Sequence, residues 1–222
     1  NTYLIELEHI GDLAVWAQLE NKNPSGSIKD RIAYSMINEA EKSGRLWKGM
    51  GIIEASSGNT GISLAMVGRE LGYPVTIVAS RKHTTNDAKR MIRYYGGKVI
   101  EVDRHFDKLY ERIKEEMDSK PGFYFWTNQT ENPASLESNE NLGRHIADIA
   151  EIDVFLASMG TGSTISGVGK SLKEGNTKTK VYLVLPDGEY SVPGVEDYSS
   201  STVPLPLFNK GIIDREVRVT EV

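Results

Sequence analysis

Residues 51–71, with the sequence GIIEASSGNTGISLAMVGREL, decide the fold class of this chain. Residues 51–55 form a short, mostly apolar run rich in isoleucine, which is typical of a buried strand. From Thr60 to Leu71 the apolar side chains recur at helical spacing, and Gly72 supplies a helix stop. A turn of small and hydroxylated residues separates the two segments. The stretch therefore predicts a strand, a tight turn and a helix in succession.

The same alternation runs along most of the chain. Short apolar, β-branched runs predict strands at residues 13–19, 51–55, 75–79, 98–102, 154–157 and 181–185. Helical spacing predicts helices at residues 28–43, 60–71, 85–95, 106–117, 133–150 and 164–173. Strands that alternate with helices of about ten or more residues need crossover connections, which give a largely parallel sheet with helices on both faces. We therefore predict the α/β fold class.

The composition excludes several classes of protein. The chain has 222 residues, and 26 basic against 31 acidic side chains give a net charge of −5, so we do not expect nucleic acid or an anionic membrane as its main partner. It has no cysteine, which excludes disulfides, thiolate metal sites and a cysteine nucleophile. The mean hydropathy is −0.38, and no apolar run reaches the roughly 18 residues that span a bilayer. We expect a soluble, cytoplasmic protein.

The two ends and one long loop depart from the regular pattern. The chain opens with Asn1 rather than Met and closes within a run typical of a strand, so we expect residues of the natural protein to be missing at both ends. Residues 187–209 hold glycine, serine and three prolines with no clear period, and we expect an ordered excursion near a functional site. The histidines stand in separate segments, so we expect no metal site: they are His9, His83, His105 and His145.

Residues 23–31, NPSGSIKDR, place a lysine at the start of a predicted helix. A Pro/Gly turn leads into the helix, and Ser27 is the expected N-cap because its oxygen can accept from first-turn N–H groups. Lys29 then lies in the first turn, where the helix dipole and partial burial lower the pKa of an amine. A neutral lysine is what a carbonyl cofactor needs to form a Schiff base. Taken alone, such a lysine is more often simply solvated.

Two strand-to-helix turns are suited to bind anions. Residues 56–61, SSGNTG, and residues 160–164, GTGST, are small and hydroxylated, so an anion can approach their backbone N–H groups at the positive end of the following helix. An ordinary turn explains the first about equally well. The second begins like a dinucleotide fingerprint, but Ile165 replaces its last glycine and no acidic residue closes the next strand. We therefore favour a single phosphate over NAD.

A fourth segment, residues 127–133 with the sequence TNQTENP, precedes a helix and taken alone is most simply a capped loop. One amine and two anion sites together imply a ligand with a reactive aldehyde and one phosphate, and a partner that carries a carboxylate. Pyridoxal phosphate with an amino acid meets this description, because the cofactor acts as an electron sink and the protein supplies position and electrostatics.

Together the four motifs resemble the cysteine synthase (O-acetylserine sulfhydrylase) family of fold-type II pyridoxal-phosphate enzymes. NPSGSIKDR is similar to its cofactor-lysine segment, SSGNTG to its substrate loop, GTGST to its phosphate loop and NQTENP to its glutamine segment, in register from residue 1 to about residue 185. The SGNTG form favours sulfhydrylases and cystathionine synthases over dehydratases, and residues 191–194, SVPG, resemble the B-type cysteine synthases. The resemblance implies a two-lobed fold similar to the tryptophan synthase β chain. The implied lobes are a smaller one of residues 23–132 and a larger one of residues 1–22 plus 133–222.

The resemblance also implies a role for each motif residue. Lys29 would hold the cofactor covalently and act as general base, and Asn59 would bond the ring hydroxyl oxygen of the cofactor. The residues implied for the cofactor phosphate are Gly160, Thr161, Gly162, Ser163 and Thr164. Those implied for the substrate carboxylate are Ser56, Ser57, Gly58, Thr60 and Gln129. Two departures from the family pattern are Ser163, where the family usually has glycine, and the family's last segment, which this sequence lacks and whose serine or threonine bonds the pyridine nitrogen.

The implied reaction is β-replacement on an O-activated L-serine with sulfide, giving L-cysteine. We expect O-acetylserine rather than O-phosphoserine, because Glu196 and Asp197 occupy the loop where some relatives place an arginine for the substrate phosphate. The alternatives are homocysteine as nucleophile, giving cystathionine, another thiol or amine, or a catalytically impaired relative that serves as a binding module. The resemblance further implies a homodimer and a possible partner in the C-terminal tail of serine acetyltransferase.

Overall fold

Two parallel β-sheets form the framework of the computed structural model, which describes residues 3–7, 11–103, 106–187, 192, 194–199, 201 and 204–220. The first sheet has the strand order β5-β4-β3-β6, the second has the order β7-β8-β9, and β1 and β2 form a separate antiparallel hairpin. The strands are β1 (Leu4–Glu6), β2 (Trp16–Gln18), β3 (Gly51–Ala55), β4 (Val75–Ser80), β5 (Lys98–Val102), β6 (Tyr124–Trp126), β7 (Val154–Ala157), β8 (Lys180–Pro186) and β9 (Arg215–Val219). The helices are α1 (Lys29–Lys42), α2 (Asn59–Leu71), α3 (Asn86–Tyr94), α4 (Phe106–Ser119), α5 (Pro133–Ala147) and α6 (Ser163–Gly175). The predicted α/β fold class is confirmed.

The first sheet is covered on both faces. Every residue of its central strands β3 and β4 is buried, as expected for a parallel sheet between helices. Ile52 and Ile77 face a core that includes α1 and α2, whereas Ile53 and Val78 face a second core beneath α4. Successive residues of one strand therefore serve opposite faces, which is the period of an extended chain.

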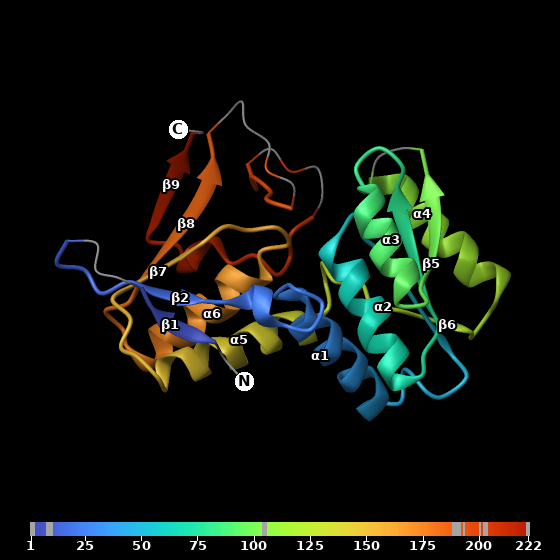
Figure 1. Ribbon diagram of the computed structural model, residues 1–222, viewed down its shortest axis with the longest axis horizontal. Coiled ribbons are helices and arrows are strands. Elements are labelled where there is room, and N and C mark those ends of the chain that lie inside the picture. The colour runs from blue at the N-terminus through green and yellow to red at the C-terminus, as the bar shows by residue number, and fades with distance from the viewer. Residues whose placement is uncertain are drawn as a thin grey trace.

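The second sheet packs one face against α6. In β8 the side chains of Val181, Leu183 and Leu185 are fully buried, and the residues between them are partly exposed. Helix α5 packs beside α6 through a small apolar cluster that includes Leu142 and Val168. Figure 1 shows the two sheets in separate bodies, with α1 lying between them and packing against both α2 and α5.

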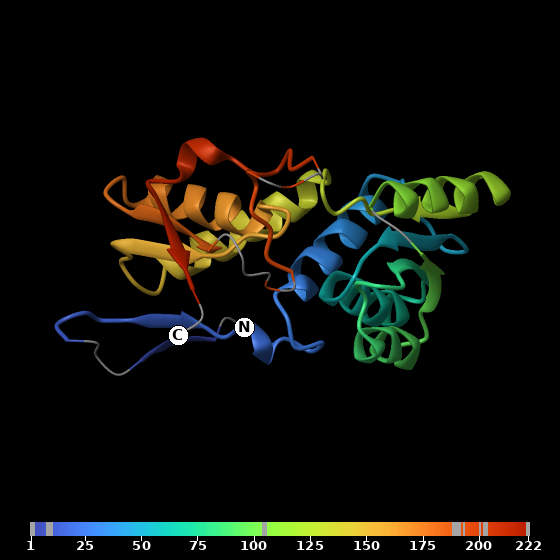
Figure 2. The same cartoon turned by 90° about the horizontal axis from the view of Figure 1, so that it is seen from above.

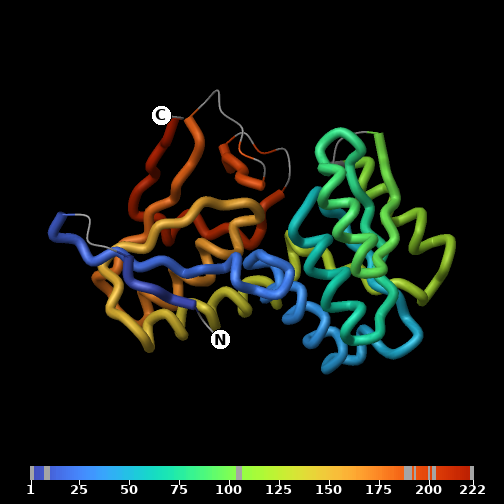
Figure 3. The backbone as a smooth tube through the Cα atoms, viewed as in Figure 1, coloured from blue at the N-terminus to red at the C-terminus, as the bar shows by residue number. Residues whose placement is uncertain are grey.

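The chain starts beside the second sheet with β1 and β2, then forms the first sheet with β3 to β6, and returns to form the second sheet with β7 to β9. The red C-terminal strand β9 is an edge strand of that sheet, and the blue N-terminal hairpin lies beside the same sheet, as the tube in Figure 3 and the view from above in Figure 2 show. The exact division into residues 23–132 and residues 1–22 plus 133–222 stays a prediction, because α1 packs against both bodies.

Some elements differ from the predicted ones for a physical reason. Of residues 13–19 only Trp16–Gln18 form a strand, and it pairs with β1 in the hairpin rather than in a parallel sheet. The sequence did not predict β1 or β6, since three-residue strands are too short to show a period. The sequence predicts a strand near the end of the chain without defined bounds, and the structure places β9 there, with one half-buried residue among four exposed ones. Within the described part of the chain no helix has the length and apolar composition that crossing a bilayer requires.

Candidate active site

The segment that carries Lys29 is held by a buried carboxylate. Asp30, the next residue, accepts hydrogen bonds from the backbone N–H of Ser25 at 2.7 Å and from the hydroxyl of Ser63 in α2 at 2.6 Å. The Ser25 hydroxyl also donates to Asp30 and lies 3.0 Å from that of Ser63. Asp30 therefore ties the turn before α1 to the neighbouring helix α2, and so fixes the point from which the Lys29 side chain starts.

The cap of α1 differs from the predicted one. The N-cap is Ile28, which already has a helical conformation, and not Ser27. Ser27 still contributes, because its hydroxyl oxygen accepts from the backbone N–H of Lys29 at 3.3 Å. Helix α1 therefore begins one residue later than the serine pattern indicates, and the turn before it is held by the hydrogen bond from the Ser25 backbone N–H to Asp30.

The Lys29 amine has the properties predicted for a lysine that forms a Schiff base. Burial lowers its pKa from the ordinary value, since removal from water disfavours the charged form. No ion pair to Lys29 occurs among the residues that the structure describes. A half-buried amine without a counter-ion is readily deprotonated and is then a nucleophile for an aldehyde.

Three helices begin directly after a parallel strand without an acidic residue in their first turn. They are α2, α5 and α6, which follow β3, β6 and β7. The other three helices each carry an aspartate there, namely Asp30, Asp87 and Asp107. An acidic side chain in the first turn offsets the positive end of the helix dipole. The two predicted anion-binding turns therefore precede two of these helices, α2 and α6, and the predicted capped loop of residues 127–133 precedes the third, α5, whose N-cap is Asn132.

The loop between β3 and α2 is organised by Ser56. Its buried hydroxyl oxygen accepts from the backbone N–H of Gly61 at 2.9 Å and of Gly58 at 3.3 Å. Helix α2 begins at Asn59, which is exposed, and Ser57 is half-buried. Neither of these two side chains makes a hydrogen bond to another described residue. Ser57 and Asn59 thus present unengaged polar groups at this helix N-terminus.

Two predicted carboxylate-binding residues that are far apart in the sequence meet at the start of α2. The hydroxyl of Thr60 donates to the side-chain oxygen of Gln129 at 2.6 Å. The side-chain nitrogen of Gln129 donates to the carbonyl oxygen of Ala55 at 3.1 Å, which leaves its second N–H available. The amide of Gln129 is therefore held in one orientation over the substrate loop.

A buried glutamate with no role assigned from the sequence lies beneath this pair. Glu54, in the middle of the first sheet, accepts from the Thr127 hydroxyl at 2.5 Å and from the backbone N–H groups of Gln129 at 3.0 Å and Ala55 at 2.8 Å. Burial raises the pKa of Glu54 from 4.5 to about 7, and these hydrogen bonds offset only part of that effect. The signal that could have found it is a single acidic residue within the apolar strand GIIEA, directly before the turn.

The turn between β7 and α6 has a backbone that requires glycine. Gly162 is the N-cap of α6 and has a φ of +84°, in the left-handed region. A Cβ atom at this position would lie 2.5 Å from the Cβ of Phe208. Phe208 comes from the end of the segment 187–209, and the neighbouring Asn209 donates its backbone N–H to the Ser166 hydroxyl in α6 at 2.8 Å. The described end of this segment thus packs on the turn, as predicted for an excursion near a site.

The hydroxyl groups of this turn are arranged unequally. Helix α6 begins at Ser163, whose buried hydroxyl accepts from the side-chain amide of Asn139 in α5 at 3.3 Å. Thr161 and Thr164 are half-buried, and the Thr161 hydroxyl lies 3.4 Å from that of Ser163. Ser163 therefore faces the protein interior, and its backbone N–H is the group that faces an anion at the helix end.

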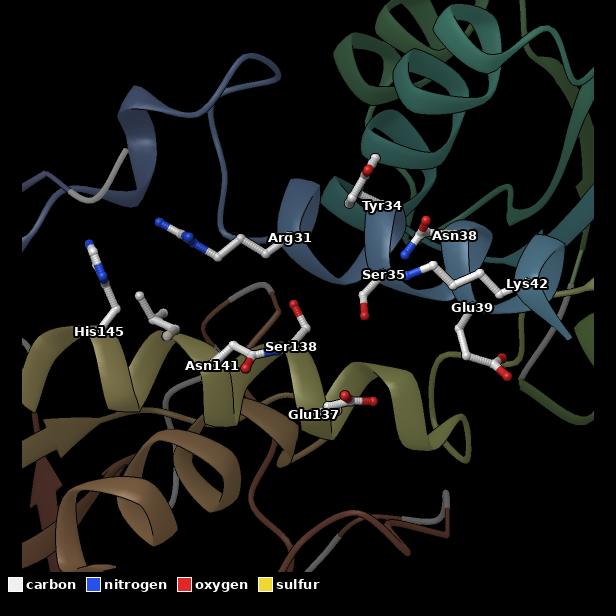
Figure 4. Close-up of a pocket in the computed structure, with 11 residues that line it drawn as sticks. Arg31, Tyr34, Ser35, Asn38, Glu39, Lys42, Glu137, Ser138, Asn141 and His145 are labelled. Carbon is white, nitrogen blue, oxygen red and sulfur yellow. The ribbon is translucent and has the colours of Figure 1, made fainter. Parts of the chain in front are cut away.

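One groove of the structure lies away from the predicted site residues. A groove of about 730 Å³ runs between α1 and α5, and Figure 4 shows its lining side chains, among them Arg31, Glu39 and His145. None of the predicted site residues lines it. Arg31 is already paired with Glu20 at 2.8 Å.

Comparison with known proteins identifies the family. The sequence model described as pyridoxal-phosphate dependent enzyme matches residues 1–205. The chain belongs to this family. Within it the chain belongs to the cysteine synthase family, since it is 35% identical over 94% of its length to a cysteine synthase from Aquifex aeolicus and 32% identical over 96% to cysteine synthase B from Salmonella typhimurium. It spans 65% and 72% of those two proteins, so it covers less than two thirds of the first.

Two other pyridoxal-phosphate relatives bear on substrate and fold. An O-ureido-L-serine synthase from Streptomyces lavendulae is 33% identical over 94% of the chain, which spans 67% of that protein. The crystal structure of a hydrogen sulfide-producing enzyme from Fusobacterium nucleatum superposes with a TM-score of 0.90 at 30% identity, covering 99% of this chain and 78% of that one. The fold is therefore that of the fold-type II pyridoxal-phosphate enzymes, as predicted.

The described residues fit pyridoxal phosphate. Lys29 supplies an amine of lowered pKa for the aldehyde. The first turn of α6 has no acidic residue, and it follows Gly162, where there is no room for a side chain. Such a helix N-terminus suits the phosphate of the cofactor. Hydrogen bonds link the Lys29 segment to α2, α2 to Gln129, and α5 to the start of α6. Within the described residues no hydrogen bond joins the side chain of Lys29 or Asn59 to the Gly160–Thr164 turn.

We predict that alanine at Gly162 destabilises the chain more than alanine at Gly96. Gly96 has a φ of +83° but nothing within 4 Å of an added Cβ, so only backbone strain of about 1 kcal/mol applies. At Gly162 the contact with Phe208 adds about 1–3 kcal/mol. Urea unfolding of both variants measures the difference. Equal losses of unfolding free energy would show that the turn has room for a side chain.

We also predict that Glu54 makes stability depend on pH. The unfolded chain loses this proton near pH 4.5 and the folded chain near 7, so the free energy of unfolding falls as pH rises through this window, by about 3 kcal/mol. Glu54→Gln removes this dependence. The excess stability of wild type over the variant should therefore shrink by that amount between pH 4.5 and 7.5 in urea unfolding. An excess that stays constant would mean that Glu54 is not buried as described.

Proposed function

We propose that this chain carries the catalytic site of a pyridoxal-phosphate-dependent cysteine synthase, which replaces the β-substituent of O-acetyl-L-serine with sulfide to give L-cysteine. The observation that carries the proposal is the meeting of Thr60 and Gln129 at the acid-free N-terminus of α2, which suits the carboxylate of an amino acid. The similarity to the cysteine synthases supports the same chemistry.

Lys29 has two tasks in this proposal. It would bind the aldehyde of the cofactor, and its free amine would take the Cα proton of the substrate as general base. Bound pyridoxal phosphate supplies the electron sink for that proton transfer. The lowered pKa of Lys29 supports both tasks, because only the neutral amine can attack or accept a proton. Asn59, unengaged at the start of α2, holds the ring oxygen of the cofactor.

The cofactor phosphate is assigned to the turn before α6. Its binding residues are Gly160, Thr161, Gly162, Ser163 and Thr164, with Ser163 acting through its backbone N–H because its hydroxyl bonds Asn139.

The substrate carboxylate is assigned to the turn before α2. Its binding residues are Ser56, Ser57, Gly58, Thr60 and Gln129. Gln129 offers its second side-chain N–H, and Ser57 offers a hydroxyl that no described residue engages. The Thr60 hydroxyl, which donates to Gln129, has to turn toward the substrate to donate to it.

The preference for an acetyl over a phosphate leaving group is assigned to one acidic loop. The backbone N–H of Glu196 donates to the Met159 carbonyl at 2.7 Å, which sets this loop against the turn before α6. Glu196 is half-buried, and burial raises its pKa. The carboxylate of Asp197 forms an ion pair with Arg218 at 2.9 Å. Glu196 is therefore the acidic residue of this loop that would disfavour a phosphate leaving group on the substrate.

A different nucleophile is the second candidate. The relative named O-ureido-L-serine synthase favours it, because that protein is about as similar to this chain as the cysteine synthases are. Homocysteine, giving cystathionine, belongs to the same class of β-replacement, and a non-catalytic binding module is the remaining alternative. The two-lobe boundaries, the homodimer, the serine acetyltransferase tail as partner and the cytoplasmic location stay predictions.

We predict that Lys29→Ala lowers β-replacement by at least about 100-fold, the contribution of a positioned general base. The measurement is product formation by protein incubated with pyridoxal phosphate, O-acetylserine and sulfide, homocysteine or hydroxyurea, and the dominant product of wild type names the nucleophile. Lys42→Ala, in the last turn of the same helix, is the matched control and should keep wild-type rates. Turnover by Lys29→Ala comparable to that of the control would place the base elsewhere.

We predict that Gln129→Ala raises the KM for O-acetylserine by roughly 10- to 100-fold, the effect of losing a hydrogen bond to a charged group. The cofactor should stay bound, because Gln129 is assigned to the substrate only. Steady-state kinetics and titration of the cofactor absorbance separate the two effects. If the variant loses the cofactor instead, the carboxylate assignment is wrong.

A further inference from the structure

Glu54 is an ionisable group where packing alone would favour an apolar one. It lies in the central strand β3, opposite Ile77 of β4, and is 1% exposed. Burying a carboxylate in a sheet costs several kcal/mol unless its partners compensate for it. Neither the proton transfer nor the cofactor contacts proposed above use this residue. The hydrogen bonds of Glu54 indicate why a carboxylate occupies this position.

The hydrogen bonds of Glu54 enclose a strained turn. One carboxylate oxygen, Oε2, accepts both the Thr127 hydroxyl and the Gln129 backbone N–H. Between these two residues lies Asn128, the one described non-glycine residue with a positive φ, at 44°. A left-handed conformation is disfavoured for residues other than glycine, although asparagine tolerates it best. The carboxylate thus holds the residues on both sides of the turn that directs Gln129 out of the sheet.

The second oxygen closes the arrangement. Oε1 accepts the backbone N–H of Ala55, whose carbonyl oxygen accepts the side-chain amide of Gln129. Glu54 therefore fixes both the backbone of Gln129 and the residue that orients its side chain. Of the three donors named above, two are backbone N–H groups, which cannot reverse to become acceptors. An amide in place of the carboxylate must aim its NH₂ group at one of them, so one hydrogen bond is lost in either orientation.

We propose that Glu54 is the positioning residue for Gln129, and that its carboxylate sets the affinity for the amino-acid substrate without touching it. The inference rests on the proposed function, in that Gln129 binds the substrate carboxylate. Ionised Glu54 holds the Asn128 turn closed, the turn aims the Gln129 amide at the start of α2, and the second N–H of that amide meets the substrate.

The variant that tests this is Glu54→Gln, which keeps the shape of the side chain and removes its charge. Kinetics are measured at pH 8, above the pKa of Glu54. The KM for O-acetylserine should rise about five- to tenfold, with kcat within about twofold and cofactor affinity unchanged. Glu116→Gln is the matched control, because Glu116 is also buried but pairs with Arg112 on α4 and should leave all three quantities unchanged. A wild-type KM for Glu54→Gln overturns the proposal.

A double variant separates positioning from general destabilisation. If Glu54 acts through Gln129, then Glu54→Gln combined with Gln129→Ala has the KM of Gln129→Ala alone, because the group being positioned is absent. If Glu54 only stabilises the sheet, the two effects multiply, kcat and cofactor retention fall as well, and the proposal fails. Glu54→Asp keeps the acceptors on a shorter side chain and should give an intermediate KM, and it replaces Glu54→Gln in this comparison should the latter not fold.

A second readout does not depend on activity. Amide hydrogen exchange, followed by NMR on the protein without cofactor, should show that Ala55 or Gln129 exchanges at least about tenfold faster in Glu54→Gln than in Glu116→Gln. Unchanged exchange at both amides overturns the positioning role, whatever the kinetics. If Gln129→Ala leaves KM unchanged while exchange accelerates, the carboxylate site of the proposed function is wrong, and the substrate-affinity part of the inference falls with it. If Gln129→Ala raises KM and Glu54→Gln does not, only the inference about Glu54 fails.

Discussion

The positive ends of three helices, each placed at the carboxyl end of a parallel strand, are the constraint from which the site follows. Helices α2, α5 and α6 begin without an acidic side chain, whereas the other three helices carry one. Free N–H groups and an uncompensated dipole at these places favour anions. In the proposed function, the phosphate of the cofactor at α6 and the carboxylate of the substrate at α2 would supply the missing negative charge. Burial lowers the pKa of Lys29, which favours the neutral form of its amine.

Two buried carboxylates hold the loops that carry this chemistry. Asp30 binds the turn before Lys29 to α2, and Glu54 binds the Gln129 segment to the end of β3. Both are ionisable groups inside the protein, and such groups lower stability compared with well-packed apolar residues. Their contribution is geometric, because each joins segments that are distant in sequence and fixes the side chain that follows. The two carboxylates hold the loops in fixed positions relative to the strands, and this fixes the positions of the site side chains. Packing of the core does not itself require either carboxylate.

The sequence predicts the parts of this protein that depend on local pattern. The spacing of apolar residues in 51–71 predicts the strand and the helix of this stretch. The predicted helix stop at Gly72 is a C-cap residue in the left-handed conformation. Parallel topology follows from the alternation, and the cofactor follows from one lysine and two anion turns. The meeting of Thr60 and Gln129 is not local, since 69 residues separate them, and only the family resemblance paired them in advance. Glu54 was missed because a strand pattern records which residues are apolar, and it cannot tell which donors will converge on an acidic one. The predicted N-cap at Ser27 is wrong because Ile28 already has helical dihedral angles and takes that position, although Ser27 still accepts the backbone N–H of Lys29.

One measurement tests the central claim, that Lys29 lies within reach of an aldehyde whose phosphate rests at the start of α6. The chain is incubated with pyridoxal phosphate, reduced with borohydride, digested and mapped by mass spectrometry. The account predicts one cofactor per chain, fixed to the peptide that contains Lys29, with other lysines unmodified at limiting cofactor. Cofactor spread evenly over exposed lysines such as Lys42, or absent from the Lys29 peptide, would contradict it.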